Sequence, residues 1–157
     1  MGEERMREKS KIKIVINNKK ARHDYHLLET YEAGVELFGK EVKSIRQGKA
    51  SLAESYVQIK AGEAIIVGMH ISPYEQAGQF NVDPMRSRRL LLKKSEIRKL
   101  HAAIQQKGLT LVPTKLYFKN HLVKLEIALA RGKKNYDKRE DLKRQAIEKQ
   151  IKLRVDR

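Results

Sequence analysis

LVPTKLYFKNHLVKLEIALARGKKNYDKR, at Leu111–Arg139, contains the clearest structural pattern in the chain. Its first part, 114–119, has the composition of a strand, and Asn120-His121 follows as a turn. Over residues 123–130 apolar side chains alternate with others, so one face of this second strand points to a core. The apolar residues then nearly stop, and a charged tail begins. We therefore expect a packed hairpin that ends in a basic arm.

The charge of the chain points to a polyanionic partner. The 157 residues carry a formal net charge of +16, and the two ends, 1–22 and 131–157, are much more basic per residue than the middle. Such an excess favours binding to nucleic acid over a merely solvated surface. An anionic membrane is the other polyanion, but the sequence has no basic amphipathic helix with bulky aromatic residues.

Composition also limits where in the cell the protein is expected and which kinds of metal or disulfide site it can form. The chain has no cysteine, which excludes disulfides and thiolate metal sites. It has no apolar run of about 18 residues, and its first residues, MGEERMREKSK, lack the apolar segment of a secretory signal. We expect a cytoplasmic protein of one-domain size with no membrane partner.

The remaining pattern predicts a mainly β fold, namely a small closed antiparallel barrel of the oligonucleotide-binding type with one or two flanking helices. Besides the hairpin, the expected strands are 11–17, 25–38 with a bulge or bend at Gly34, and the pair 56–60 and 64–71 around a turn at Ala61-Gly62. A helix over 27–33 is the alternative to the strand there. The expected helices are 39–48, ended by Gly48, and 95–106, capped by Ser95 and ended by Gly108. Residues 17–23 and 70–85 are expected to be loops, the first polar and basic.

The chain thus divides into a flexible basic arm at 1–11, a barrel at 12–130 and a basic tail at 131–157. In helical register the tail has two narrow apolar stripes on nearly opposite sides, and neither is broad enough to dock firmly. A free helix of this length is marginal in water. We therefore predict a tail that is disordered when free and helical on a partner.

Catalytic and metal-binding motifs are weak. GVELFGKE at 34–41 departs from a phosphate-binding loop because Glu41 stands where the metal needs a hydroxyl. His23 and His26 lack a convincing third ligand. We expect no enzyme activity, no metal and no cofactor; a metal-dependent nuclease assembled from Asp83, Glu75 and Glu54 is the minority alternative.

RSRRLLLKK at 86–94 places three leucines within a cationic frame. As a strand it would turn Leu90 and Leu92 inward and Leu91 outward, where an exposed leucine could pack on a splayed base or sugar.

Longer strings resemble a known family, the SsrA-binding protein or small protein B family. They are NKKARHDY (18–25), EAGVELFGKEVKSIRQGKASLAESYV (32–57), GEAIIVGMHISPY (62–74), DPMRSRRLLL (83–92), LVPTKLYFKN (111–120) and ARGKKNYDKRE (130–140). The resemblance implies an oligonucleotide-binding-like barrel without catalysis that binds the tRNA-like domain of transfer-messenger RNA. It also implies delivery to stalled ribosomes, where the tail enters the vacant messenger channel at the small-subunit decoding centre, folds as a helix and enables trans-translation. Elongation factor Tu on the same RNA is a further implied partner.

The resemblance also implies site residues. The RNA-binding positions are Glu32, Leu91 and Lys124, with Arg22 and His23 close by; the ribosome-contacting positions are Gly132, Lys133, Lys134, Tyr136, Asp137, Lys138 and Arg139. Tyr136 stands where many members carry histidine. Glu32 would repel phosphate, so we interpret it as an acceptor for a base amino edge or a 2′-hydroxyl, or as an anchor for a neighbouring cation. A general RNA-binding or ribosomal protein is the alternative.

Overall fold

The computed structural model describes residues 11–74 and 82–155. Its strands are β1 (Ile12–Asn17), β2 (Tyr25–Val35), β3 (Ala50–Ser51), β4 (Tyr56–Lys60), β5 (Glu63–Val67), β6 (His70–Ile71), β7 (Arg88–Leu91), β8 (Thr110–Lys119) and β9 (Leu122–Gly132). Its helices are α2 (Lys19–Asp24), α3 (Gly39–Arg46), α4 (Lys94–Lys107) and α5 (Asn135–Val155). Nearly all of the flexible arm expected at 1–11 lies outside the described residues, as does 75–81 of the expected long loop.

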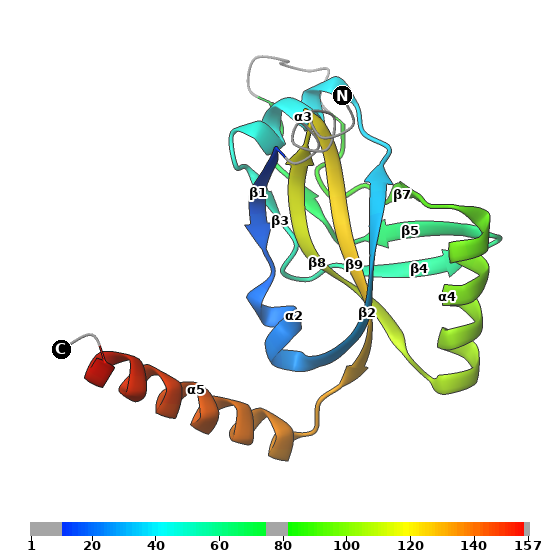
Figure 1. Cartoon of the computed structure of the whole chain (residues 1–157). Coiled ribbons are helices and arrows are strands. Elements are labelled where there is room, and N and C mark those ends of the chain that lie inside the picture. Colours follow the sequence, from blue (N-terminus) through cyan, green and yellow to red (C-terminus); the bar gives the residue numbers. More distant parts are fainter. Residues whose placement is uncertain (1–10, 75–81, 156–157) are drawn as a thin grey trace, which may run out of the picture.

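The predicted closed antiparallel barrel is confirmed. Strands pair in the order β8, β4, β5, β7, β2 and β9, and β9 pairs back onto β8, which closes the ring (Figure 1). β1 extends the sheet beside the second half of β8, and the short strands β3 and β6 pair separately. Every one of these pairings is antiparallel.

Two tight turns behave as the sequence predicts. Asn120 and His121 both have positive φ, 50° and 71°, and so do Ala61 and Gly62, 51° and 76°. Two positive φ values in succession characterise the type I′ turn, whose twist matches that of the flanking strands. These turns set the register of the β8–β9 and β4–β5 hairpins.

The alternation in β9 also produces the expected core. Leu125 and Ile127 are fully buried, and Leu129 is nearly so. The opposite face is open at Lys124, but farther along Ala130 packs against Ala21 of α2 and is buried as well. One large cluster of buried side chains fills the barrel, and a second, smaller apolar cluster lies under α2.

Four local predictions were wrong. The single strand expected at 64–71 is two strands, β5 and β6, which belong to different sheets. Most of the loop expected at 17–23 is helix α2, which starts at Lys19, because the Asn18 side chain accepts from the backbone N–H of Ala21 at 3.4 Å and Ala21 is buried. The register irregularity in β2 falls between Leu27 and Glu29, so the bulge offered for Gly34 is wrong. Helix α4 begins after Lys93, not Ser95: the Glu96 carboxylate accepts from the backbone N–H of Lys93 at 3.1 Å.

The predicted ends of two helices are confirmed. Gly48 follows α3 with φ 72°, and Gly108 follows α4 with φ 63°, the left-handed conformation that glycine adopts without strain. Leu100 of α4 is fully buried in the core and attaches that helix to the barrel.

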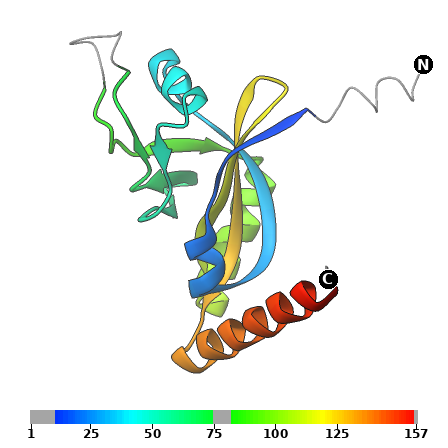
Figure 2. The same ribbon diagram turned by 90° about the vertical axis from the view of Figure 1, so that its left-hand side faces the viewer.

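The tail forms the predicted helix, α5, which leaves the barrel from the end of β9 (Figure 2). Its apolar side chains stay exposed, for example Ile147 and Leu153 at 57% and 67%. The expectation that α5 does not dock along its length is therefore confirmed. Disorder in the free state stays a prediction.

Candidate nucleic-acid interface

One groove on the barrel surface brings together three of the expected RNA-binding residues: Glu32 from β2, Leu91 from β7 and Lys124 from β9. Leu91 is 51% exposed beside the buried Leu90, so the outward orientation predicted for it is confirmed. Gly34 explains the close approach of the strands here, because a Cβ at this position would lie 3.3 Å from Leu91 Cβ. The groove thus has an apolar floor with charges of both signs beside it.

Glu32 is held from two sides. The Tyr117 hydroxyl donates to Glu32 Oε2 at 2.5 Å, and Lys119 Nζ donates to Oε1 at 3.3 Å. The pKa of Glu32 is held below its usual value mainly by the hydrogen bond from Tyr117. The hydrogen bond and charge of Lys119 and the charge of Lys124 lower it further. Burial, followed by the hydrogen bond to Glu32, raises the pKa of Tyr117, so its hydroxyl stays protonated. The groove therefore contains an ionised carboxylate, which can only accept hydrogen bonds.

More cations border the same groove. Arg89 and Lys93 line it together with Lys124. The Arg89 guanidinium lies 3.9 Å from Glu36 and 3.7 Å from Glu63, and its side chain is 54% exposed. Exposed cations around an apolar patch suit an unstacked nucleotide, whose phosphate and base need different partners.

The other two expected RNA-binding residues lie elsewhere. Arg22 and His23 are exposed on α2, next to the start of the tail. β2 separates the two sets: Tyr25 pairs with Gly132 at one end, and Gly34 pairs with Lys124 at the other. A strand of this length spans about 30 Å at roughly 3.3 Å per residue. The structure therefore gives two sites at opposite ends of one ladder.

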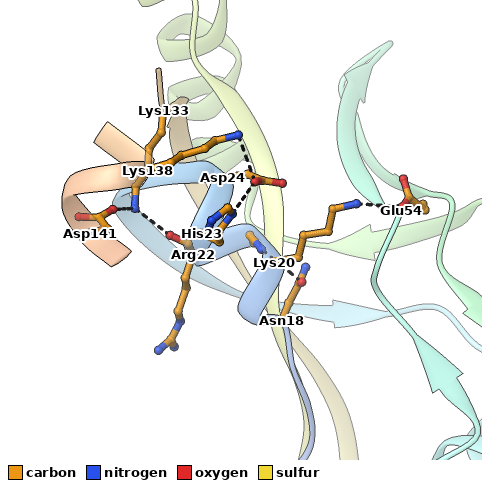
Figure 3. A network of polar contacts seen from close by, with 10 residues as sticks. Asn18, Lys20, Arg22, His23, Asp24, Glu54, Lys133, Lys138 and Asp141 are labelled. Atoms are coloured by element: carbon orange, nitrogen blue, oxygen red, sulfur yellow. Dashed lines mark hydrogen bonds and ion pairs between the residues drawn. The ribbon is translucent and has the colours of Figure 1, made fainter. Parts of the chain in front are cut away.

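The root of the tail is held by a polar network (Figure 3). Lys133 Nζ is paired with the Asp141 carboxylate and donates to the backbone carbonyl of Arg22 at 3.0 Å. Lys138 Nζ lies 3.3 Å from Asp24 Oδ1, and the same carboxylate contacts His23 at 2.9 Å. These contacts connect the first turns of α5 to α2.

The carboxylates of this network are ionised. The pKa of Asp24 is held below its usual value mainly by the hydrogen bond with His23, and the contact with Lys138 lowers it further. Lys133 lowers the pKa of Asp141 in the same way. The lysine–carboxylate pairs of the network are therefore pairs of full charges, which salt can weaken where they are exposed.

The other predicted tail residues lie on either side of this network. Gly132 ends β9, and exposed Lys134 donates its backbone N–H to Asp137 Oδ2 at 3.3 Å. Arg139 is exposed in α5, and the side chain of Tyr136 lies outside the described residues.

A family model described as SmpB protein matches residues 15–157, which include both sites. The chain belongs to the SmpB family. The SsrA-binding protein of Pelotomaculum thermopropionicum is 53% identical over 148 residues, which cover 92% of this chain and 97% of that protein. The SsrA-binding protein of Microcystis aeruginosa is 58% identical over 135 residues, 85% of this chain and 88% of that one.

A solved structure, "tmRNA-SmpB: a journey to the center of the bacterial ribosome", contains a chain that is 49% identical to this SmpB family member. The TM-score is 0.65, and the match covers 84% of this chain and 93% of that one. At this level of identity and coverage, the similarity extends through most of both chains.

The carboxylates of the nuclease alternative lie apart in this SmpB chain or outside its described part. Asp83 accepts from the backbone N–H of Met85 at 2.9 Å, Glu54 pairs with Lys20 at 2.9 Å, and Glu75 lies outside the described residues. Within 11–74 and 82–155, no group of three or more His, Asp or Glu side chains is placed to hold a metal. No helix of that part is long and apolar enough to cross a membrane.

Sequence reasoning missed Tyr117 and Lys119, which hold Glu32. Both lie on β8, 85 and 87 positions away in the chain from their partner. Only the alternation along β8, which puts residues 117 and 119 on one face, could have suggested that they act together.

Proposed function

We propose that this chain is an RNA-binding adaptor of trans-translation. It binds the tRNA-like domain of transfer-messenger RNA, delivers that RNA to stalled ribosomes and enables tagging of the nascent chain and ribosome rescue. Elongation factor Tu bound to the same RNA is a further partner. The adaptor works in the cytoplasm and has no catalytic step, metal or cofactor of its own.

The observation that carries this proposal is the groove of Glu32, Leu91 and Lys124 in a chain of the SmpB family. The groove supplies an apolar floor for a base, a cation for phosphate and a carboxylate for an N–H or O–H donor. Such a set suits an unpaired nucleotide held in a fixed RNA shape.

The domain division is part of the same proposal. Residues 12–130 bind the RNA, and residues 131–157 enter the empty messenger channel and contact the decoding centre. The exposed tail residues Lys134 and Arg139 are available for ribosomal RNA, and Tyr136 supplies a ring where many relatives carry histidine. Arg22 and His23 would contact RNA beside the root of the tail.

The test is a salt series of binding to a tRNA-like fragment of transfer-messenger RNA and to an unrelated hairpin of equal length. The full chain and a truncation after Ala130 are compared. We expect both forms to prefer the tRNA-like fragment, and only the full chain to support tagging on a message without a stop codon. A steep salt dependence shared by both RNAs, without preference, would indicate a general RNA-binding protein instead.

A further inference from the structure

We infer that Tyr117 is a positioning residue for RNA recognition: its hydroxyl fixes the Glu32 carboxylate so that the carboxylate faces the groove as a ready acceptor. The inference rests on the proposed function, since it assumes that RNA occupies this groove. It adds a residue that does not itself touch the ligand.

The geometry starts from the ladder of β8, β9 and β2. Tyr117 pairs directly with Lys124, and Lys124 pairs with Gly34 on its other side, so these three residues form one row across the sheet. Residues opposite one another in an antiparallel ladder point to the same face. Tyr117 therefore lies beside the cation of the groove, only 7% exposed, with its hydroxyl on Glu32 Oε2.

The next row explains why Glu32 needs this contact. Glu32 pairs with Glu126, so two carboxylates face each other across the ladder. Glu126 is turned toward Thr114, whose hydroxyl donates to Glu126 Oε2 at 2.6 Å. Glu32 is turned toward Tyr117 and Lys119. Each carboxylate thus has its own donor, which keeps two like charges apart on one face.

Fixing Glu32 in advance matters for binding. A free glutamate side chain loses conformational entropy when RNA immobilises it, and a side chain that is already held does not pay this cost again. Lys119 alone would hold the charge but not the orientation, because an ammonium group on a flexible stem accepts many geometries. The buried phenol has one position, and it contacts a defined oxygen.

The chain offers a control on β2, the strand that carries Glu32. The Tyr31 hydroxyl donates to Glu29 Oε2 at 2.7 Å, and Lys99 Nζ lies 3.6 Å from that carboxylate. This is the same Tyr–Glu–Lys arrangement, but none of its three residues lines the groove. Y31F removes a hydrogen bond of the same kind, although a more exposed one, without touching the candidate site.

The experiment measures binding of full-length wild type, Y117F, Y31F, E32Q and the double variant E32Q/Y117F to the tRNA-like fragment and to the unrelated hairpin. Circular dichroism at the assay temperature confirms that each protein is folded. We expect Y117F to weaken binding to the tRNA-like fragment about tenfold, the equivalent of ~1.4 kcal/mol, and to leave hairpin binding nearly unchanged. We expect Y31F to match wild type, and the double variant to match E32Q, because Tyr117 acts through Glu32.

The pH profile is a second readout that a structural role would not move. Tyr117 contributes most to lowering the pKa of Glu32, and the charges of Lys119 and Lys124 remain in the variant. Removing the Tyr117 hydroxyl should raise the pKa of Glu32. As the solution is acidified from neutral to about pH 4, Y117F should therefore lose affinity for the tRNA-like fragment at a higher pH than wild type does.

Three results would overturn the inference: Y117F binding as tightly as wild type, the same loss in Y31F, or an undiminished effect of Y117F in the E32Q background. A wild-type protein that shows no preference for the tRNA-like fragment would overturn the proposed function as well. The two failures are therefore distinguishable within one set of measurements.

Discussion

Replacing Glu41 with glutamine should destabilise the barrel strongly. The Glu41 side chain is 3% exposed and accepts from Arg88 Nε at 2.6 Å and from Arg86 Nη2 at 2.5 Å. Arg88 is fully buried, and its other nitrogens donate to the backbone carbonyls of Met69 and Pro84. Glutamine would leave a buried guanidinium without its counter-charge, which typically costs about 3–5 kcal/mol. Urea unfolding at neutral pH measures this cost.

A surface pair supplies the control. Glu36 lies 3.9 Å from Arg89, and both side chains are more than half exposed. Glu36→Gln should change the free energy of unfolding by no more than about 1 kcal/mol, since exposed pairs contribute little. If E41Q and E36Q unfold at similar urea concentrations, the reasoning about the contacts of Glu41 with Arg86 and Arg88 is refuted.

The pH dependence has a definite sign. Burial would raise the pKa of Glu41, but the hydrogen bonds from Arg86, the Phe38 backbone and Arg88 outweigh it and hold the pKa below 4.5. A carboxyl whose pKa is lower in the folded state stabilises the fold above its ordinary pKa and loses this contribution as the pH falls through the folded pKa. Wild type should therefore lose stability below about pH 4.5, whereas E41Q should lack this part of the acid dependence.

Three further predictions follow from the fold, the groove and the tail. Gly68 has φ 82°, and a Cβ there would lie 2.6 Å from the Glu54 backbone oxygen, so Gly68→Ala should cost more than about 1 kcal/mol in urea unfolding. Gly62→Ala should cost less than Gly68→Ala, because a Cβ at Gly62 meets no atom within 4 Å and only its φ of 76° strains an alanine. Leu91→Ala should leave stability within about 0.5 kcal/mol but weaken binding to the tRNA-like fragment in a filter assay, because Leu91 is half exposed; a stability loss without an affinity loss would contradict a role on RNA. A peptide of residues 131–157 should give a weakly helical far-ultraviolet spectrum, since the apolar residues of α5 make little contact; a strongly helical spectrum would refute disorder in the free tail.

Local periodicity accounts for what the sequence predicted well. The alternation in 123–130 and the two-residue turns indicated both hairpins, and Gly48 and Gly108 marked helix ends. The outward position of Leu91 followed from the same alternation. These features depend on neighbours within a few residues, which a single sequence displays.

The features that the sequence did not predict depend instead on residues far apart in the chain, or have no repeating pattern. α2 is six residues long and only Ala21 of it is buried, so it has no apolar repeat to read. The Glu41–Arg88 pair spans 47 positions and the Glu32–Tyr117 pair spans 85. Such contacts exist because the barrel closes, and no local pattern encodes which carboxylate will meet which donor. For the same reason Arg22 and His23, close to Glu32 in sequence, lie at the other end of β2.

That separation bears on how one small domain can serve two partners. β2 and β9 pair along nearly their whole lengths, with Gly34 and Lys124 at the groove and Tyr25 and Gly132 at the root of the tail. A continuous antiparallel ladder is stiff, so it fixes the distance between the two sites instead of letting them compete for one surface. RNA bound in the groove would leave the helix free to enter a channel from the opposite end of the ladder. The charges at the root of the tail lie on α2, on the first turns of α5 and, at Lys133, between β9 and α5, so reorienting α5 would break ion pairs there without disturbing Glu32 or Tyr117.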